Sequence, residues 1–266
     1  MSNTLMQWSE PHIDSIITTL QVKNHSVTYH DGYLYCFGGY DGRRNHMTLT
    51  LYSIFRKKWI RAGPIGGTPL PGRNGHTATL VGDGGRIMII DGWFGSGPLA
   101  ALDLLVLDIS NGVEELRMNA PTVRGTPPGP CNMHSADYVE GQKEIYVFRG
   151  GNGREYLNDL HALHVDTYTW RYVDTTGEVP EIRANHSSAV LNETGELFIF
   201  GGWNGDKRLN DLHILNTKTS VWTRPDVGGI LPHPRAGNCC YVHYLLQLIF
   251  FRFHLTLLFF DFPAHA

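Results

Sequence analysis

Residues 185–205 read Asn-His-Ser-Ser-Ala-Val-Leu-Asn-Glu-Thr-Gly-Glu-Leu-Phe-Ile-Phe-Gly-Gly-Trp-Asn-Gly, and this stretch decides the fold. His186 opens a run of small and β-branched residues, and a second, apolar run ends at Gly201-Gly202. A Leu-Asn-Asp-Leu segment from Leu209 and a segment around Trp222 follow. Runs of β-branched and aromatic residues bounded by Gly, Asn and Asp predict four short strands, which we name a to d in chain order.

The same unit occurs four times in the chain. The leading histidines are His25, His76, His134 and His186, at separations of 51, 58 and 52 residues. A period near 50 residues is typical of repeat proteins whose units are the blades of a β-propeller. No sustained period of 3.6 residues competes with this pattern, so a helical fold is not expected.

Two features recur inside the unit: a glycine pair ends strand b, and a tryptophan lies in strand d. The glycine pairs are Gly38-Gly39, Gly150-Gly151 and Gly201-Gly202, and the tryptophans are Trp59, Trp170 and Trp222. Glycine predicts a reversal with positive φ and a contact too close for a Cβ, and tryptophan predicts a large apolar contact between blades. The second copy has Asp91-Gly92 and Glu114 at these places, so we expect looser packing there.

With these four Gly-Gly/Trp units the sequence resembles the kelch β-propeller family over residues 5–240. The resemblance implies an all-β propeller with four complete four-stranded blades. Their expected bounds are about residues 22–64, 73–118, 132–175 and 184–226. Trp8 has the spacing of a d strand, so residues 5–11 are expected to complete the last blade, as closure of a propeller requires. Residues 241–266 are expected to be a divergent apolar tail or an aberrant last blade, because Arg252-Phe253 stands where Gly-Gly belongs.

Composition excludes several classes of protein. The net charge of −3 gives no basic excess to displace phosphate counterions, so nucleic acid is not an expected partner. Residues 1–10 lack the basic and apolar regions of a signal peptide, and the four cysteines show no metal-ligand spacing. We therefore expect a reduced, cytoplasmic protein. The apolar stretch 245–260 is a weak membrane candidate, because Arg252 and His254 interrupt it.

Strand parity places the d–a and b–c connections on one face of the disc. Arginines precede strand a in the second and fourth copies and in a partial fifth copy, and aromatic residues follow the glycine pair. In kelch substrate adaptors, peptide contacts come from similar positions. The resemblance thus implies that this face binds an acidic or carboxylate-ended peptide. The expected contact residues are Arg73, Arg183, Arg235, Tyr40, Trp93 and Trp203. In the alternative interpretation, the arginines tie loops to a neighbouring blade.

The favoured function is a scaffold or substrate-recognition module that binds a protein or peptide. The alternative is an actin- or cytoskeleton-associated kelch protein, and the less favoured alternative is a metal-dependent kelch-fold enzyme. Equivalent histidines in stacked blades are about 10 Å apart and cannot share a zinc ion. Glu155 and Asp159 fit half of the iron motif of plant specifier proteins, but Leu163 stands at the histidine position. No catalytic residue, metal or cofactor is therefore expected.

Overall fold

In the computed structural model the regular secondary structure of the described residues is β-strand apart from one short 3-10 helix, Glu140–Gln142. The described residues form five separate sheets. They comprise residues 21–62, 65–69, 71–82, 84–95, 104–228, 232–243, 247–251 and 259–261.

The strand bounds follow the repeat. The first sheet contains β1 (Ser26–His30), β2 (Tyr33–Phe37), β3 (Leu49–Ser53) and β4 (Lys58–Arg61). The second contains β5 (Gly66–Gly67), β6 (Thr77–Val81), β7 (Arg86–Ile90), β8 (Leu104–Asp108) and β9 (Arg117–Asn119). The third contains β10 (Arg124–Gly125), β11 (Ser135–Val139), β12 (Glu144–Phe148), β13 (Leu160–His164) and β14 (Thr169–Tyr172). The fourth contains β15 (Thr176–Gly177), β16 (Ser187–Leu191), β17 (Glu196–Trp203), β18 (Arg208–Asn216) and β19 (Val221–Thr223). The last contains β20 (Cys239–His243), β21 (Gln247–Phe251) and β22 (Phe259–Asp261).

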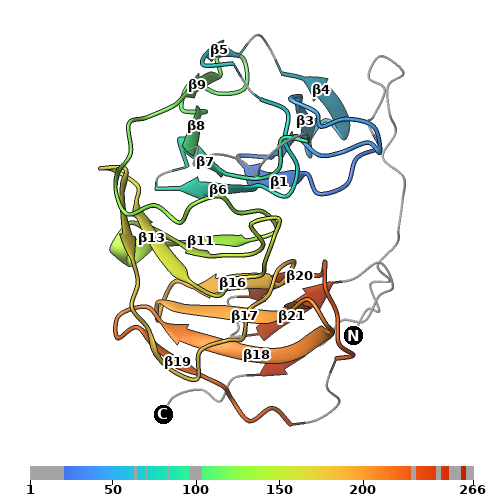
Figure 1. The fold of residues 1–266 in the computed structure, drawn as a ribbon. Coiled ribbons are helices and arrows are strands. Elements are labelled where there is room, and N and C mark those ends of the chain that lie inside the picture. Colours follow the sequence, from blue (N-terminus) through green and yellow to red (C-terminus); the bar gives the residue numbers. More distant parts are fainter. Residues whose placement is uncertain are drawn as a thin grey trace, which may run out of the picture.

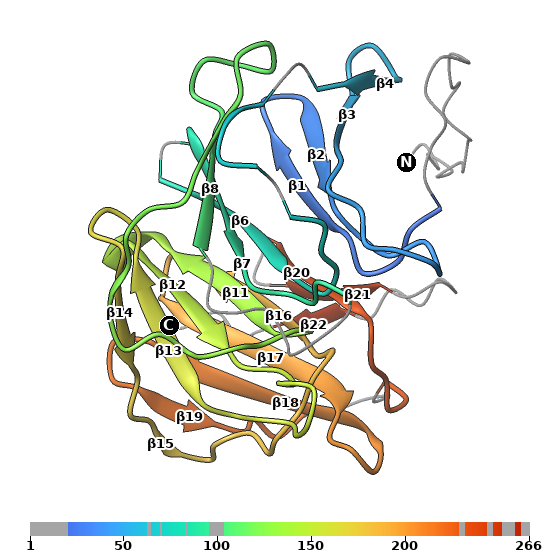
Figure 2. The same ribbon diagram turned by 45° about the horizontal axis from the view of Figure 1, so that its top comes forward.

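The sheets are arranged as propeller blades. The first strands of successive blades, β1, β6, β11, β16 and β20, contact one another in chain order. Figure 1 shows β6, β11, β16 and β20 side by side, and Figure 2 shows the blades following each other from the blue first sheet to the orange and red last ones. The expected all-β propeller arrangement with four blades is therefore confirmed.

The connection into each of blades two to four contributes a short fifth strand that the sequence did not predict. β5, β10 and β15 pair in parallel with the d strand of the blade that follows them. Gly67, Gly125 and Gly177 lie in these strands with φ of 93°, 80° and 84°. A Cβ on any of them would collide with the backbone of the d strand, which explains the glycines.

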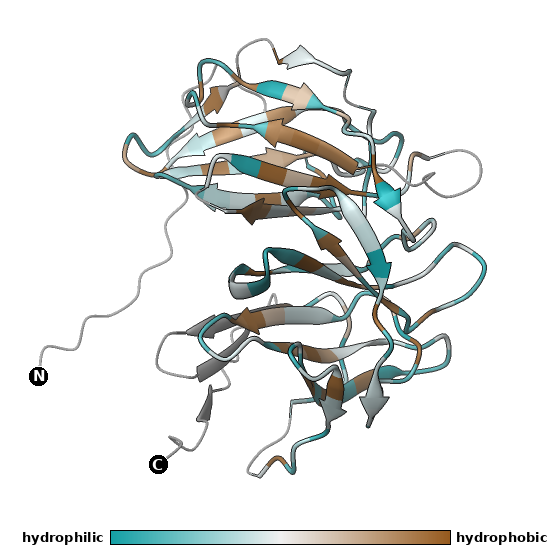
Figure 3. Ribbon diagram, turned by 90° about the vertical axis from the view of Figure 1, so that its left-hand side faces the viewer, coloured by the Kyte–Doolittle hydropathy of each residue, from teal (hydrophilic) through white to brown (hydrophobic). Residues whose placement is uncertain are grey.

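Apolar side chains fill the three junctions between the first four blades. Figure 3 shows brown, apolar residues concentrated on the strands and teal, polar residues in the loops. Trp170 and Trp222 are buried at the second and third junctions. Trp59 contacts Tyr52 edge to face, with 5.2 Å between ring centroids, on a side of the first blade that no described sheet covers.

The expectation for Glu114 was wrong. Met118 pairs with Leu107 as Trp222 pairs with Leu215, and Met118 is fully buried in the first junction. The c–d loop of the second blade is longer than in the other blades, which displaced the position that spacing predicted. The core of this blade is therefore filled and not loose.

A chain of backbone hydrogen bonds crosses each of the four junctions between successive described sheets. The residue before each leading position adopts the left-handed conformation, with φ between 52° and 67°. These residues are Asn24, Gly75, Met133, Asn185 and Gly237. Each N–H after the first donates to the carbonyl of its counterpart in the preceding blade at 2.8–2.9 Å. The sequence showed the histidines but not this ladder.

The remaining expectations concern the ends of the chain. Trp8 and the proposed strand 5–11 lie outside the described residues. In the segment 241–266, residues 241–243, 247–251 and 259–261 belong to strands of the last sheet. Within the described ranges the fold has no helix with the length and apolarity that crossing a bilayer needs.

Candidate functional site

The d–a and b–c connections share one face, which we call the d–a/b–c face. The backbone N–H groups of Arg73, Arg183 and Arg235 donate to carbonyls just before strand c of the preceding blade or in its first residues, at 2.9–3.2 Å. Asn158 and Asn210 donate side-chain hydrogen bonds to the carbonyls of Pro180 and Pro232 in the d–a connections. These contacts fix the two sets of loops against each other.

The arginines of the predicted contact set are buried on this face. Arg73 and Arg183 are 0% exposed and Arg235 is 6% exposed. Arg183 donates two hydrogen bonds of 2.8 Å to the carboxylate of Asp211 and a third to the carbonyl of Gly201. The alternative interpretation had the arginines tie loops to a neighbouring blade; their backbone N–H groups do so, whereas the guanidinium of Arg183 bonds within its own blade.

Arg73 and Arg235 are held by different contacts. Arg73 donates to the carbonyl of Asp91 and lies over the ring of Phe94, 4.8 Å from its centroid. Arg235 donates through Nε to the carbonyl of His233. Both arginines are thus held behind the loop surface.

Asp211 is the electrostatic centre of the fourth blade. Burial on its own raises the pKa of this carboxyl, but hydrogen bonds from His213 and Arg183 outweigh burial and hold the pKa well below its usual range. The other ring nitrogen of His213 bonds to the carbonyl of Glu178 in the d–a connection. Through Arg183 and His213, this carboxylate therefore fastens strand c to the connection that runs from the third blade into the fourth.

The third blade builds the same pair from other chain positions. Cys131 stands at the position of Arg183, three residues before the leading histidine. Arg149 instead reaches Asp159, with 3.1 Å between Nη1 and Oδ2. Asp159 also bonds to His161, as Asp211 bonds to His213.

This exchange corrects the alignment of the third glycine pair. Gly151 bridges to Asn132 as Tyr40, Trp93 and Trp203 bridge to the residues before their own strand a. Arg149-Gly150 is therefore the structural counterpart of Gly201-Gly202, and Gly151 takes the aromatic position. The adjacent glycines allowed the sequence alignment to slip by one residue.

The three predicted aromatic residues lie at the inner ends of separate b–c loops. Tyr40, Trp93 and Trp203 are all partly exposed. The b–c loops of the first, third and fourth blades turn sharply where Asp41, Asn152 and Asn204 each accept two backbone N–H groups through the side chain. The aromatics belong to one face but come from different blades, with no direct contact between them.

Sequence reasoning missed the basic residues that are exposed on this face. They lie at the tips of the b–c loops: Arg43, Arg44, Arg154, Lys207 and Arg208. The signal for them in the sequence is their place within a few residues of the glycine pair. These exposed side chains, and not the buried arginines, present positive charge to solvent.

A hollow of about 390 Å³ opens beside these loops at the fourth blade. Asn210, Asp211 and Arg224 supply its polar lining, and Pro225 and Val227 supply apolar lining. Arg224 is exposed, and its backbone N–H donates to Glu178.

Three of the four leading histidines, His76, His134 and His186, are buried and lie in separate blades, whereas His25 is exposed. The Nε2 atoms of His76, His134 and His186 bond to hydroxyls of the preceding blade at 2.8–3.0 Å. Burial lowers the pKa of each to about 3, so all three stay neutral. Among the described side chains, no group of three or more His, Cys, Asp or Glu is placed to hold a metal ion.

Comparison with known proteins identifies the repeat. The family described as KLHDC2/KLHL20/DRC7 Kelch-repeats domain matches residues 75–255, and the Kelch motif matches residues 22–56. Kelch domain-containing protein 3 of Rattus norvegicus is 27% identical over 233 residues, which cover 81% of this chain and 57% of that protein. Host cell factor 2 of Homo sapiens is 28% identical over 224 residues, which cover 71% of this chain and 28% of that protein.

Shorter matches are more similar. Acyl-CoA-binding domain-containing protein 4 of Arabidopsis thaliana is 42% identical over 115 residues, which cover 43% of this chain and 17% of that protein. The chain thus spans less than two thirds of the length of each of these relatives. Since the kelch-repeat match covers more than half of the chain and the blades have the repeat's four-stranded form, this chain belongs to the kelch-repeat family.

Proposed function

We propose that this kelch domain acts as a scaffold or substrate-recognition module that binds an acidic segment of a protein partner on its d–a/b–c face. The observation that carries the proposal is the set of exposed basic side chains at the b–c loop tips, beside half-exposed aromatics. Basic and aromatic side chains on one rim match the anchors that dominate peptide interfaces. The kelch relatives support a role in protein interaction.

In this proposal the six predicted residues divide into two roles. Tyr40, Trp93 and Trp203 contact the partner, because part of each side chain is exposed. Arg73, Arg183 and Arg235 act as positioning residues, because their guanidinium groups are buried and hold the loops in place. Direct contact with the partner passes to the exposed loop residues Arg43, Arg44 and Arg208.

The charge of the loop tips sets the class of partner. Asp41 is already engaged by His46, with 2.7 Å between Oδ2 and Nε2, and by two backbone amides. Arg43 and Arg44 project beside it without an ion pair to any described residue. Free guanidinium groups beside aromatic rings favour carboxylates on a peptide that also carries apolar side chains.

The test is an array of fluorescent peptides rich in Glu and Phe, with matched peptides in which Gln replaces Glu. We expect saturable binding of the acidic peptides only. The double variant Arg43→Ala/Arg44→Ala should weaken binding about tenfold or more, because charged hydrogen bonds are lost. Its matched control is Arg56→Ala/Lys57→Ala, which removes two exposed charges from a c–d turn on the opposite face.

Two outcomes would reject the d–a/b–c face as the binding site. They are equal binding of Glu and Gln peptides, and equal weakening of binding by both double variants. A cosedimentation assay with filamentous actin tests the cytoskeletal alternative with the same variants. A cytoplasmic setting is part of the proposal and is supported by the free thiols of Cys36, Cys131 and Cys239.

A further inference from the structure

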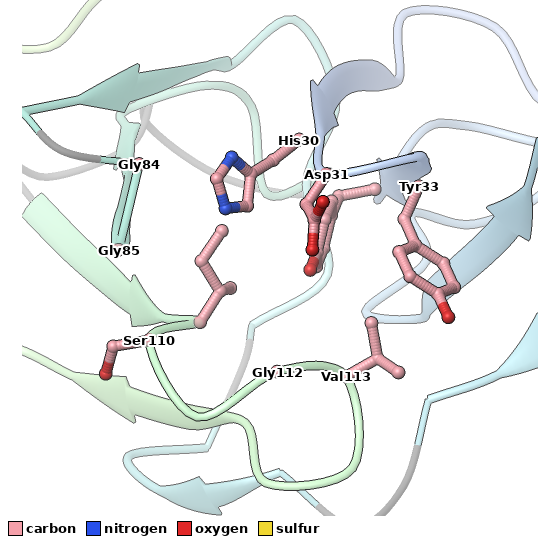
Figure 4. Close-up of a pocket in the computed structure, with 10 residues that line it drawn as sticks. His30, Asp31, Tyr33, Gly84, Gly85, Ser110, Gly112 and Val113 are labelled. Atoms are coloured by element: carbon pink, nitrogen blue, oxygen red, sulfur yellow. The ribbon is translucent and has the colours of Figure 1, made fainter.

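A second hollow lies between the first two blades, on the face formed by the a–b and c–d turns. Its volume is about 260 Å³. Figure 4 shows His30, Asp31 and Tyr33 of the first blade facing the c–d loop of the second blade, which carries Ser110 and Val113. This face is opposite to the d–a/b–c face, so the hollow is separate from the site proposed above.

Tyr35 brings to this hollow a hydroxyl that has no partner among the described residues. Its side chain is 97% buried, since only 3% is exposed, and it lines the hollow. Its hydroxyl makes no hydrogen bond to any of the described residues, and its oxygen is not fully enclosed by them but open to the hollow. Burial, with Tyr33 and Asp31 nearby, raises the pKa of Tyr35 to about 12, so the group stays a neutral donor and acceptor.

Asp31 adds a carboxylate that is also unpaired among the described residues. It lies in the a–b turn in the left-handed conformation, with φ of 44°, and is exposed. Tyr33 and Val113 supply aromatic and apolar walls on either side. The hollow therefore combines a negative charge, a tyrosine hydroxyl and an apolar lining.

At the third junction an arginine joins an equivalent tyrosine and a carboxylate. Tyr146 occupies in the third blade the place of Tyr35 in the first, as the strand registers show. The guanidinium of Arg171 donates to the hydroxyl of Tyr146 at 3.0 Å and forms two hydrogen bonds with Glu144. At the equivalent of Arg171 the first blade has Ile60, so its tyrosine and carboxylate lack a guanidinium.

At the second junction an arginine of strand b, the first residue of β7, lies in the corresponding region. Arg86 stands where the first blade has Tyr33. It donates to the carbonyl of Val165 and to the carboxylate of Asp166, both at 3.0 Å. The next two junctions are thus filled by the protein's own arginines, and the first is not.

We propose that the hollow between the first two blades receives one arginine side chain from a protein partner. The guanidinium would pair with Asp31, donate to the Tyr35 hydroxyl and lie against Tyr33, which reproduces the contacts of Arg171 within this chain. The volume of about 260 Å³ is just below that of small-molecule sites, which begin near 300 Å³, and it suits a single side chain.

The test follows amide chemical shifts by NMR while Nα-acetyl-arginine methylamide is added to the full chain. Nα-acetyl-citrulline methylamide, which has the same shape without the charge, is the matched probe. We expect saturable shifts at Gly84 and Gly112 with the arginine probe alone. Asp31→Asn should weaken binding about tenfold, and Tyr35→Phe about threefold, because a charged and a neutral hydrogen bond are lost.

Two further variants keep the result interpretable. Asn tolerates the left-handed conformation, so Asp31→Asn preserves the turn. Glu193→Gln removes an exposed carboxylate from the a–b turn of the fourth blade and should leave the shifts unchanged. Tyr33→Arg supplies the guanidinium from the chain, as Arg86 does, and should block the probe.

Equal shifts from the arginine and citrulline probes, or undiminished binding by Asp31→Asn, would overturn the proposal. An intact response of the d–a/b–c face to acidic peptides in these variants would show that the failure concerns this hollow alone.

Discussion

The third and fourth blades each pair an arginine with the equivalent aspartate, but the arginine comes from a different chain position in each blade. In the fourth blade Arg183, just before strand a, pairs with Asp211 and also donates to the carbonyl of Gly201. In the third blade Arg149 stands at the position of that glycine and pairs with Asp159. The blade therefore needs the ion pair at this place, and either chain position can supply the arginine.

The two pairs differ in burial. Arg183 and Asp211 have exposed side-chain fractions of 0% and 13%, whereas those of Arg149 and Asp159 are 16% and 23%. Arg183 also forms two hydrogen bonds with its carboxylate, and Arg149 forms one. The same chemical pair should thus contribute more to stability in the fourth blade.

The largest effect is expected for Arg183→Ala. This change leaves the carboxylate of Asp211 buried without its main cation, which should lower the free energy of unfolding by about 3–5 kcal/mol. Urea denaturation at pH 7 measures the loss. Arg208→Ala removes an exposed arginine from the same blade and should stay within about 0.5 kcal/mol. A loss for Arg183→Ala no larger than that of the control would refute the structural role.

The next effect is the loss of stability at acid pH, which should be of similar size for the third and the fourth blade. His134 and His186 have pKa values lowered to about 3 by burial, so below the unfolded pKa near 6.5 only the unfolded state takes up these protons. Each histidine should therefore cost about 1.4 kcal/mol of stability per pH unit as the pH falls from 6.5 towards 3. Chemical denaturation between pH 7 and pH 4.5 measures the slope.

The variants His134→Gln and His186→Gln should flatten this slope by similar amounts. Asp137 acts in the opposite direction, because burial raises its pKa to about 6 and favours the folded state when it binds a proton. Since Asp137 is present in both variants, the difference from the unmodified chain isolates the histidine. An unchanged slope would contradict burial of the neutral imidazole.

Arg149→Ala is expected to have a smaller effect than Arg183→Ala. The carboxylate of Asp159 keeps its bond to His161 and is more accessible to water, so we expect a loss of about 1–3 kcal/mol. The same urea titration provides the value. A loss as large as that for Arg183→Ala would show that burial does not separate the two blades.

The blade repeat could be read from the sequence because it depends on local features. Strand patterns, glycine pairs and Trp170 and Trp222 recur at nearly one spacing, and they occupy corresponding places in the blades. The register failed where loop length changed, which placed Glu114 instead of Met118 in the second d strand. The alignment also failed at Gly150-Gly151, because this pair looks like the counterpart of Gly201-Gly202, whereas the true counterpart is Arg149-Gly150.

The site was harder to predict than the fold. Arginine is usually exposed, so Arg73 and Arg183 looked like surface residues. Their burial depends on carboxylates and backbone carbonyls that are far away along the chain. The hollow beside Tyr35 was also invisible, because it exists only where the first two blades meet.

The exchange of Arg149 and Cys131 tests the central claim most directly. Arg149→Gly alone should lose the ion pair with Asp159 and lower the free energy of unfolding. Adding Cys131→Arg rebuilds the fourth blade's arrangement in the third, and urea denaturation should show recovery to within about 1 kcal/mol of the unmodified chain. A double variant no more stable than Arg149→Gly would contradict the claim that the pair, and not the chain position, is what the blade requires.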